Sequence, residues 1–137
     1  MTTKGFKKYH SVTKIEKKYF REALMLSYRI WLLHFLVPYK KLELKYACSG
    51  SLLIEPNTCN NVKKAIQRAS MLTFWKNQCL IQTFVARKML NRRNIQSTAY
   101  LGLIKVDDSK YNAHAWLIAS DIEVVASNVN CTQIHTF

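Results

Sequence analysis

The sequence is poor in the residues that interrupt or stiffen a chain. Of its 137 residues only three are Gly and two are Pro, and no internal repeat is present. This composition excludes collagen-like, low-complexity and solenoid chains. Because 49% of the residues are hydrophobic, a packed core can form, and a chain of this length is expected to form one compact unit.

Patterns typical of metal sites and of secretion are also missing. The four cysteines, Cys48, Cys59, Cys79 and Cys131, include no C-x-x-C pair, so we expect no metal and no cofactor. The first residues show no apolar run followed by a small-residue cleavage site. We therefore expect a cytoplasmic protein with free thiols.

No apolar run is long enough to cross a membrane. The run from Ala23 to Val37 has 15 residues and contains Arg29 and His34, whereas a spanning helix needs about 20 apolar residues. We expect a largely buried helix here, and membrane contact is not expected. The alternative is an interfacial helix or a docking face for a partner.

Acidic residues are scarce, and they are unevenly placed. The net charge is +13, and residues 56–106 contain nine Lys or Arg but no Asp or Glu. Such an excess indicates an anionic partner: nucleic acid, a membrane surface or an acidic peptide. No nucleic-acid-binding motif is present, so a nucleic-acid partner is not expected.

The hydrophobic periodicity changes from helical to alternating near Ile95. Helices are expected over residues 16–36, ended by Pro38, from Asn60 or Asn61 to about residue 72, and over residues 78–90 with Asn77 as N-cap. Strands are expected over residues 95–106, 111–119 and 122–127, joined by short turns, while residues 42–54 are ambiguous. Helices followed by an antiparallel meander predict an α+β fold.

Cys79 stands at the predicted start of the third helix. A thiol there lies near unpaired backbone N–H groups and the positive end of the helix dipole, and Lys76 adds positive charge. These features favour the thiolate, which is the nucleophilic form of cysteine. The alternative is an ordinary buried cysteine that only fills space.

His114 is a candidate base for this thiol. In an alternating strand His114, Trp116 and Ile118 share one face, and His114 can reach Cys79 if that face packs on the helix of Cys79. Hairpin arithmetic about Asp121 places residue 128 opposite His114. Asn128 is therefore the expected orienting residue, with Asp121 as the alternative.

Several short motifs occur in order along the chain. They are Val62-x-x-Ala65, Arg68-Ala69, Phe74-Trp75-Lys76-Asn77-Gln78-Cys79-Leu80, Leu90-Asn91-Arg92-Arg93-Asn94-Ile95, Leu101-Gly102-Leu103-Ile104 and Ala113-His114-Ala115-Trp116. This ordered series resembles the transglutaminase-like leader peptidases of lasso-peptide biosynthesis. The resemblance covers about residues 62–127. The sequence departs from the family at Leu117-Ile118, where Val-Glu is common, and at the third, acidic position, where it reads Ala126-Ser127-Asn128.

The resemblance implies a papain/transglutaminase-like α+β fold, with the nucleophile helix packed on a small antiparallel sheet. Residues 1–59 would form an N-terminal helical segment for leader or partner docking, and residues 60–137 the cysteine peptidase domain. The implied catalytic residues are Cys79 and His114, with Asn128 or Asp121 third, and Trp75, Gln78 and Trp116 would bind substrate.

The function implied by the resemblance is removal of the leader from a ribosomally made lasso-peptide precursor. The implied partners are the precursor, a small leader-recognition protein and an ATP-dependent lasso cyclase. Two alternatives stay open: a non-catalytic basic module that binds nucleic acid or a membrane surface, and the same site transferring an acyl group to an amine instead of water.

Overall fold

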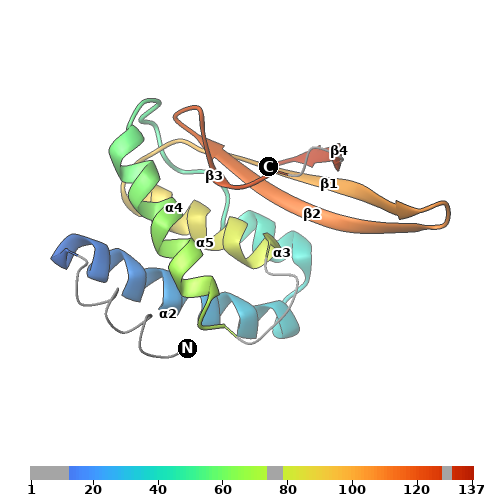
Figure 1. Ribbon diagram of the computed structural model, residues 1–137, viewed down its shortest axis with the longest axis horizontal. Coiled ribbons are helices and arrows are strands. Elements are labelled where there is room, and N and C mark those ends of the chain that lie inside the picture. The colour runs from blue at the N-terminus through green and yellow to red at the C-terminus, as the bar shows by residue number, and fades with distance from the viewer. Residues whose placement is uncertain (1–12, 74–78, 128–130) are drawn as a thin grey trace.

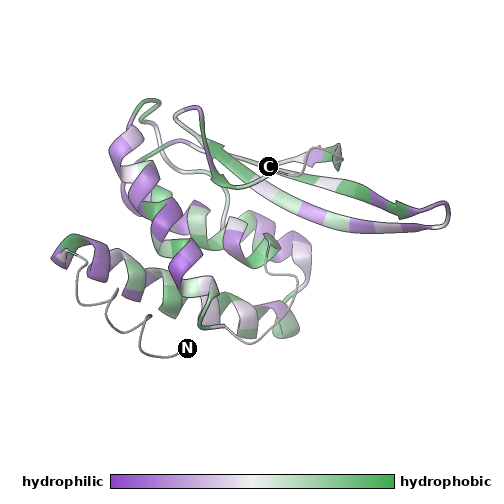
Figure 2. Cartoon of the chain, viewed as in Figure 1, coloured by the Kyte–Doolittle hydropathy of each residue, from purple (hydrophilic) through white to green (hydrophobic). Residues whose placement is uncertain are grey.

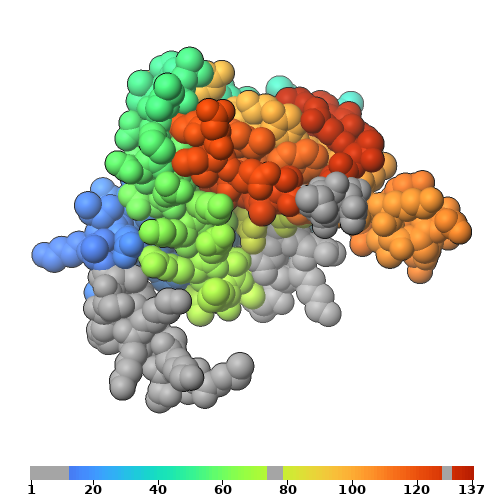
Figure 3. Space-filling model, turned by 45° about the horizontal axis from the view of Figure 1, so that its top comes forward, coloured from blue at the N-terminus to red at the C-terminus, as the bar shows by residue number. Residues whose placement is uncertain are grey.

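The computed structural model describes residues 13–73, 79–127 and 131–137. Within these described residues four helices come first: α2 (Lys14–Leu36), α3 (Tyr39–Lys45), α4 (Pro56–Ser70) and α5 (Cys79–Arg92). Four strands follow: β1 (Thr98–Asp107), β2 (Lys110–Ala119), β3 (Ile122–Val125) and β4 (Cys131–Thr136). The helices lie together on one side, and the long β1–β2 hairpin projects beyond them (Figures 1 and 3). The predicted α+β class is confirmed.

The sheet is antiparallel, with the order β3-β2-β1-β4. Strands β2 and β3 are joined by a tight turn in which Ser120 and Asp121 have φ angles of 51° and 60°. Two successive left-handed residues are typical of a hairpin turn that matches the strand twist. The first three strands agree with the predicted meander, but β4 was not predicted. It pairs with β1, which lies far from it in the sequence, so no hairpin-turn signal between the two strands could predict it.

Helices α2 and α4 begin earlier than the sequence patterns indicated. The Thr13 side chain caps α2 by accepting a hydrogen bond from the Glu16 backbone N–H at 3.2 Å, and the Glu16 carboxylate accepts one from the Thr13 backbone N–H at 3.1 Å. Helix α4 begins at Pro56 rather than at an Asn60 or Asn61 cap, because Pro is well suited to the first helical position. The boundary expected between residues 59 and 60 therefore falls inside a helix.

One core joins the N-terminal helices to the rest of the fold. Side chains from α2, α4, α5 and the sheet are buried in it, including Ala23, Leu26, Ile30, Val62, Ile66, Phe84, Val85, Met89, Leu117 and Val124. Each fully buried large apolar side chain contributes about 1.5–3 kcal/mol. In Figure 2 the hydrophobic colour of β2 is strongest near β3 and fades toward the hairpin tip. The core therefore lies at the β3 end of the hairpin, where the helices meet the sheet.

Within the described residues, no helix is long and apolar enough to span a membrane.

Candidate functional site at the start of α5

Cys79 is the first residue of α5, and its side chain is partly exposed. The first turn of α5 contains no acidic residue. Because backbone N–H groups at a helix start have no intrahelical acceptor, they can stabilise negative charge beside them. The predicted placement of Cys79 in the first turn of a helix is confirmed, while the expected cap, Asn77, lies outside the described residues.

A cavity of about 240 Å³ opens beside the Cys79 thiol. It is lined by Cys79, Leu80, Leu101, Asn112, Ala113 and Ala115. Apart from the thiol, Asn112 is the one polar side chain that the described part of the chain contributes to this lining. Three of the lining residues, Asn112, Ala113 and Ala115, flank His114 on β2, so the cavity joins the start of α5 to the strand that carries the histidine.

The ring of His114 is fixed in orientation by two contacts. It stacks on Trp116 with the ring centroids 6.0 Å apart, and its Nε2 lies 2.9 Å from the backbone carbonyl oxygen of Ala126. Because a carbonyl oxygen only accepts hydrogen bonds, Nε2 must carry the proton. The other nitrogen, Nδ1, is then the basic atom of the neutral ring.

Strand β2 contributes residues from both of its faces to the cavity beside Cys79. The pairing of β1 with β2 is regular from Thr98 to Lys105, so side chains alternate strictly along this part of β2. Ala113 and Ala115 line the cavity and Leu117 lies in the core, and Asn112, which shares the strand face of His114, lines the same cavity. Small and apolar residues fit the close contact between helix and sheet. Among the described residues no hydrogen bond joins the Cys79 thiol to the His114 ring.

Cys131 of β4 lies against Gly102 of β1. A Cβ on Gly102 would lie 2.5 Å from the Cys131 sulfur and 3.0 Å from Cζ3 of Trp116, so no larger residue fits there. Gly102 pairs with His114 across the two strands. Burial raises the pKa of the Cys131 thiol, and the nearby Cys79 thiol raises it further. Cys79 and Cys131 are therefore neighbours, and Cys131 lies against the residue paired with His114.

Residues 24–134 match the sequence family described as the transglutaminase-like superfamily. The chain belongs to this superfamily. Its members are typically cysteine proteases or transglutaminases. No match was found among curated proteins, and none was found among solved structures.

The transglutaminase-like match is longer than the motifs that suggested it. It begins within α2 and ends within β4, so it contains the whole of α5 and β2. Much of the N-terminal helical segment thus falls within the transglutaminase-like region, which agrees with the shared core.

The remaining predicted residues of this transglutaminase-like site lie in different parts of the chain, and some lie outside the described residues. Trp75, Gln78 and Asn128 lie outside the described residues, although Leu117 pairs with Val125 in the register that the hairpin arithmetic assumed. Asp121 is exposed in the β2–β3 turn, and no contact joins it to His114. Trp116 is 8% exposed and stacks on Tyr100 at 5.4 Å, which leaves little of it for substrate.

Sequence reasoning missed three features of the site. The carbonyl of Ala126 is a backbone atom that any residue supplies, so its role has no sequence signal. Cys131 lies 52 positions after Cys79 and comes close to it only through the β1–β4 pairing. Gly102 was quoted as part of a motif, but its role in leaving room for Cys131 and Trp116 depends on that same pairing. Among the described residues, no three His, Cys, Asp or Glu side chains are grouped as metal ligands.

Proposed function

We propose that this protein is a cysteine peptidase that removes the leader from a ribosomally made lasso-peptide precursor before cyclisation. The observation that carries the proposal is the position of Cys79. It begins α5 and borders a cavity whose wall is formed by the residues on either side of His114. Membership of the transglutaminase-like superfamily supports thiol chemistry at this position.

In the proposed reaction the Cys79 sulfur attacks the carbonyl carbon at the junction of leader and core. The oxyanion that forms accepts a hydrogen bond from the backbone N–H of Cys79. The proton from the thiol passes to Nδ1 of His114 and then to the leaving amine of the core peptide. Water hydrolyses the resulting thioester, which frees the leader with a new carboxylate and restores the thiol.

Nδ1 of His114 is the atom assigned to proton transfer because Nε2 is used in the bond to Ala126. Proton transfer requires a contact of about 3 Å between the sulfur and Nδ1, and catalytic contacts in ligand-free enzymes are often longer. The proposal therefore requires Nδ1 of His114 to come within reach of the Cys79 sulfur. Asn128 stays the proposed side-chain orienter, alongside the Ala126 carbonyl.

The proposed partners follow from the same function. They are the precursor peptide, a small leader-recognition protein that delivers it, and the ATP-dependent cyclase that receives the freed core. The proposed setting is the cytoplasm, where thiols stay reduced. The four cysteines are unpaired in the structure.

The direct test is cleavage of the precursor by purified protein, followed by mass spectrometry. Cys79→Ala, Cys79→Ser and His114→Ala should each abolish cleavage while the melting temperature stays unchanged. Cys131→Ser is the matched control, because it alters a neighbouring thiol, and it should retain cleavage. Normal cleavage by Cys79→Ala would overturn the proposal. A product joined to an added amine, in place of a free carboxylate, would show acyl transfer instead of hydrolysis.

A further inference from the structure

Helix α2 carries apolar side chains on the face that points away from the core. Its buried residues are Ala23, Leu26, Ser27 and Ile30. On the opposite side an exposed apolar stripe runs along the second half of the helix. It consists of Met25, Tyr28, Leu32, Phe35 and Leu36, which are 73%, 37%, 56%, 68% and 80% exposed. The spacing of three or four residues places these side chains on one face, where a surface helix is normally polar.

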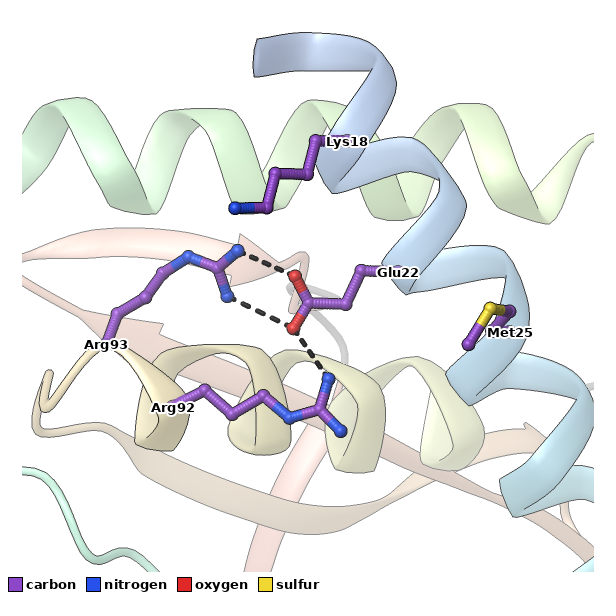
Figure 4. A pocket seen from close by; sticks show the side chains of 5 residues that line it. All are labelled: Lys18, Glu22, Met25, Arg92 and Arg93. Atoms are coloured by element: carbon purple, nitrogen blue, oxygen red, sulfur yellow. Dashed lines mark hydrogen bonds and ion pairs between the residues drawn. The ribbon is translucent and has the colours of Figure 1, made fainter.

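A basic cleft adjoins this apolar stripe. The cleft has a volume of about 550 Å³ and is lined by Lys18, Glu22, Met25, Arg92 and Arg93. Figure 4 shows Lys18, Glu22 and Met25 coming from α2, with both arginines rising from the end of α5. Met25 belongs to both the cleft and the stripe, so the two form a continuous surface.

The three cationic side chains in the cleft differ in how many hydrogen bonds and ion pairs they already make. Arg93 bonds both oxygens of Glu22, at 3.2 and 2.6 Å, donates to the Met89 carbonyl and lies over the Tyr19 ring. Arg92 makes one bond to Glu22, at 3.0 Å, and its side chain is 45% exposed. Lys18 is exposed and has no hydrogen-bond or ion-pair partner among the described residues. Lys18 and Arg92 can therefore bind an incoming carboxylate by donating hydrogen bonds to it.

We propose that the apolar stripe and the basic cleft together form a docking surface for an acidic, amphipathic segment of a partner polypeptide. Its apolar side chains would cover the stripe, and one of its carboxylates would enter the cleft between Lys18 and Arg92. Charge complementarity favours this occupant, because the chain carries a net charge of +13 and its one carboxylate in the cleft is already paired.

Two other occupants fit the surface less well. A lipid bilayer is flat, so its headgroups would not follow Lys18 and Arg92 into a cleft that also contains the Glu22 carboxylate. A second copy of the chain would bring together two molecules of charge +13, and their repulsion opposes that contact.

The docking surface goes beyond the proposed peptidase function, because it lies away from the reacting sulfur. Arg92 ends α5 and Cys79 begins it, so about 20 Å separates them along the helix axis. A partner held at α2 would leave the cavity beside Cys79 open. Docking and thiol chemistry can therefore be tested separately.

The test is fluorescence anisotropy with the full-length protein and a labelled synthetic peptide. The peptide has Leu at every third or fourth position and Glu elsewhere, and a peptide with Lys in place of Glu is its control. Wild-type protein should bind only the Glu peptide, and added salt should weaken that binding. Leu32→Asp and Arg92→Glu should each weaken binding about tenfold or more. Val106→Asp and Lys110→Glu are the matched controls on the β1–β2 hairpin; Val106 is 57% exposed, as Leu32 is 56% exposed, and both variants should bind normally.

Four outcomes would overturn the proposal. They are no binding of the Glu peptide, equal binding of both peptides, vesicle binding that Leu32→Asp abolishes, and a wild-type dimer in sedimentation that Leu32→Asp dissociates. The milder Leu32→Ala variant guards against misfolding and should weaken binding in the same direction. Iodoacetamide labelling of Cys79 in Leu32→Asp keeps this result distinct from the peptidase proposal, because that labelling should be unchanged.

Discussion

The two ends of α5 differ in charge, in ion pairing and in the exposure of their side chains. At its end, Arg92 and Arg93 pair with Glu22 of α2, and Arg93 has only 19% of its side chain exposed. Basic residues in the last turn also suit the negative end of the helix dipole. At its start, the Cys79 thiol is partly exposed beside the cavity, and no acidic residue occupies the first turn.

This difference assigns stability to the end of α5 and reactivity to its start. The end of α5 is held by charges that satisfy one another, which fixes the position of the helix against α2. Backbone N–H groups at the start of a helix can stabilise a negative charge that develops during a reaction. A rigidly held helix can in this way present a reactive first turn.

The largest expected effect comes from removing the support at the end of α5. A protein that begins at Asn60 lacks α2, α3 and the first turn of α4, and with them Ala23, Leu26 and Ile30 of the core. We expect it not to fold, so circular dichroism should show no cooperative thermal transition. A cooperative transition in this shortened chain would mean that residues 60–137 fold independently.

A smaller effect is expected from breaking the ion pair at the end of α5. Arg93→Ala leaves the Glu22 carboxylate, 14% exposed, without its main partner, and should lower the free energy of unfolding by about 2–3 kcal/mol. Arg92→Ala is the matched control, because its side chain is 45% exposed and the loss should stay below about 1 kcal/mol. Urea unfolding measures both values. Equal losses in the free energy of unfolding would show that the pair with Arg93 stabilises the protein no more than the pair with Arg92.

The same pair predicts how stability depends on pH. Burial by itself would raise the pKa of Glu22, but the hydrogen bonds and charges of Arg93 and Arg92 together hold it below the ordinary value of 4.5. A lowered pKa stabilises the folded state above pH 4.5, and this contribution is lost as the pH falls through the pKa of the folded protein. Melting temperatures between pH 6 and pH 3 should fall less in Glu22→Gln than in the wild type.

The sequence predicted the parts of this comparison that depend on local patterns. The first turn around Cys79, the strand of His114 and the turn at Asp121 follow from caps, alternation and hairpin signals. The link between Glu22 and Arg93 could not be predicted, because it joins residues 71 positions apart through helix packing. For the same reason sequence alone did not determine which face of β2 meets α5, nor that β4 would bring Cys131 to Gly102.

The smallest expected effect concerns the third member of the site. Asp121 has a φ of 60°, so Asp121→Ala should cost about 1 kcal/mol of stability, while Asp121→Asn should cost less because Asn tolerates this conformation. Neither change should slow precursor cleavage. Asn128→Ala should lower turnover without abolishing it, since the Ala126 carbonyl also orients His114. A greater loss of turnover in Asp121→Asn than in Asn128→Ala would assign the orienting role to the aspartate.

The measurement that tests the central claim most directly is the rate of iodoacetamide labelling of each cysteine at neutral pH, followed by peptide mass spectrometry. Cys48 is the internal reference, because it is exposed and belongs to no helix or strand. If the start of α5 activates its thiol, Cys79 should be labelled faster than Cys48 although Cys48 is the more exposed, and His114→Ala should slow Cys79 alone. Slower labelling of Cys79 than of Cys48, unchanged by His114→Ala, would contradict the assignment of Cys79 as a nucleophile assisted by His114.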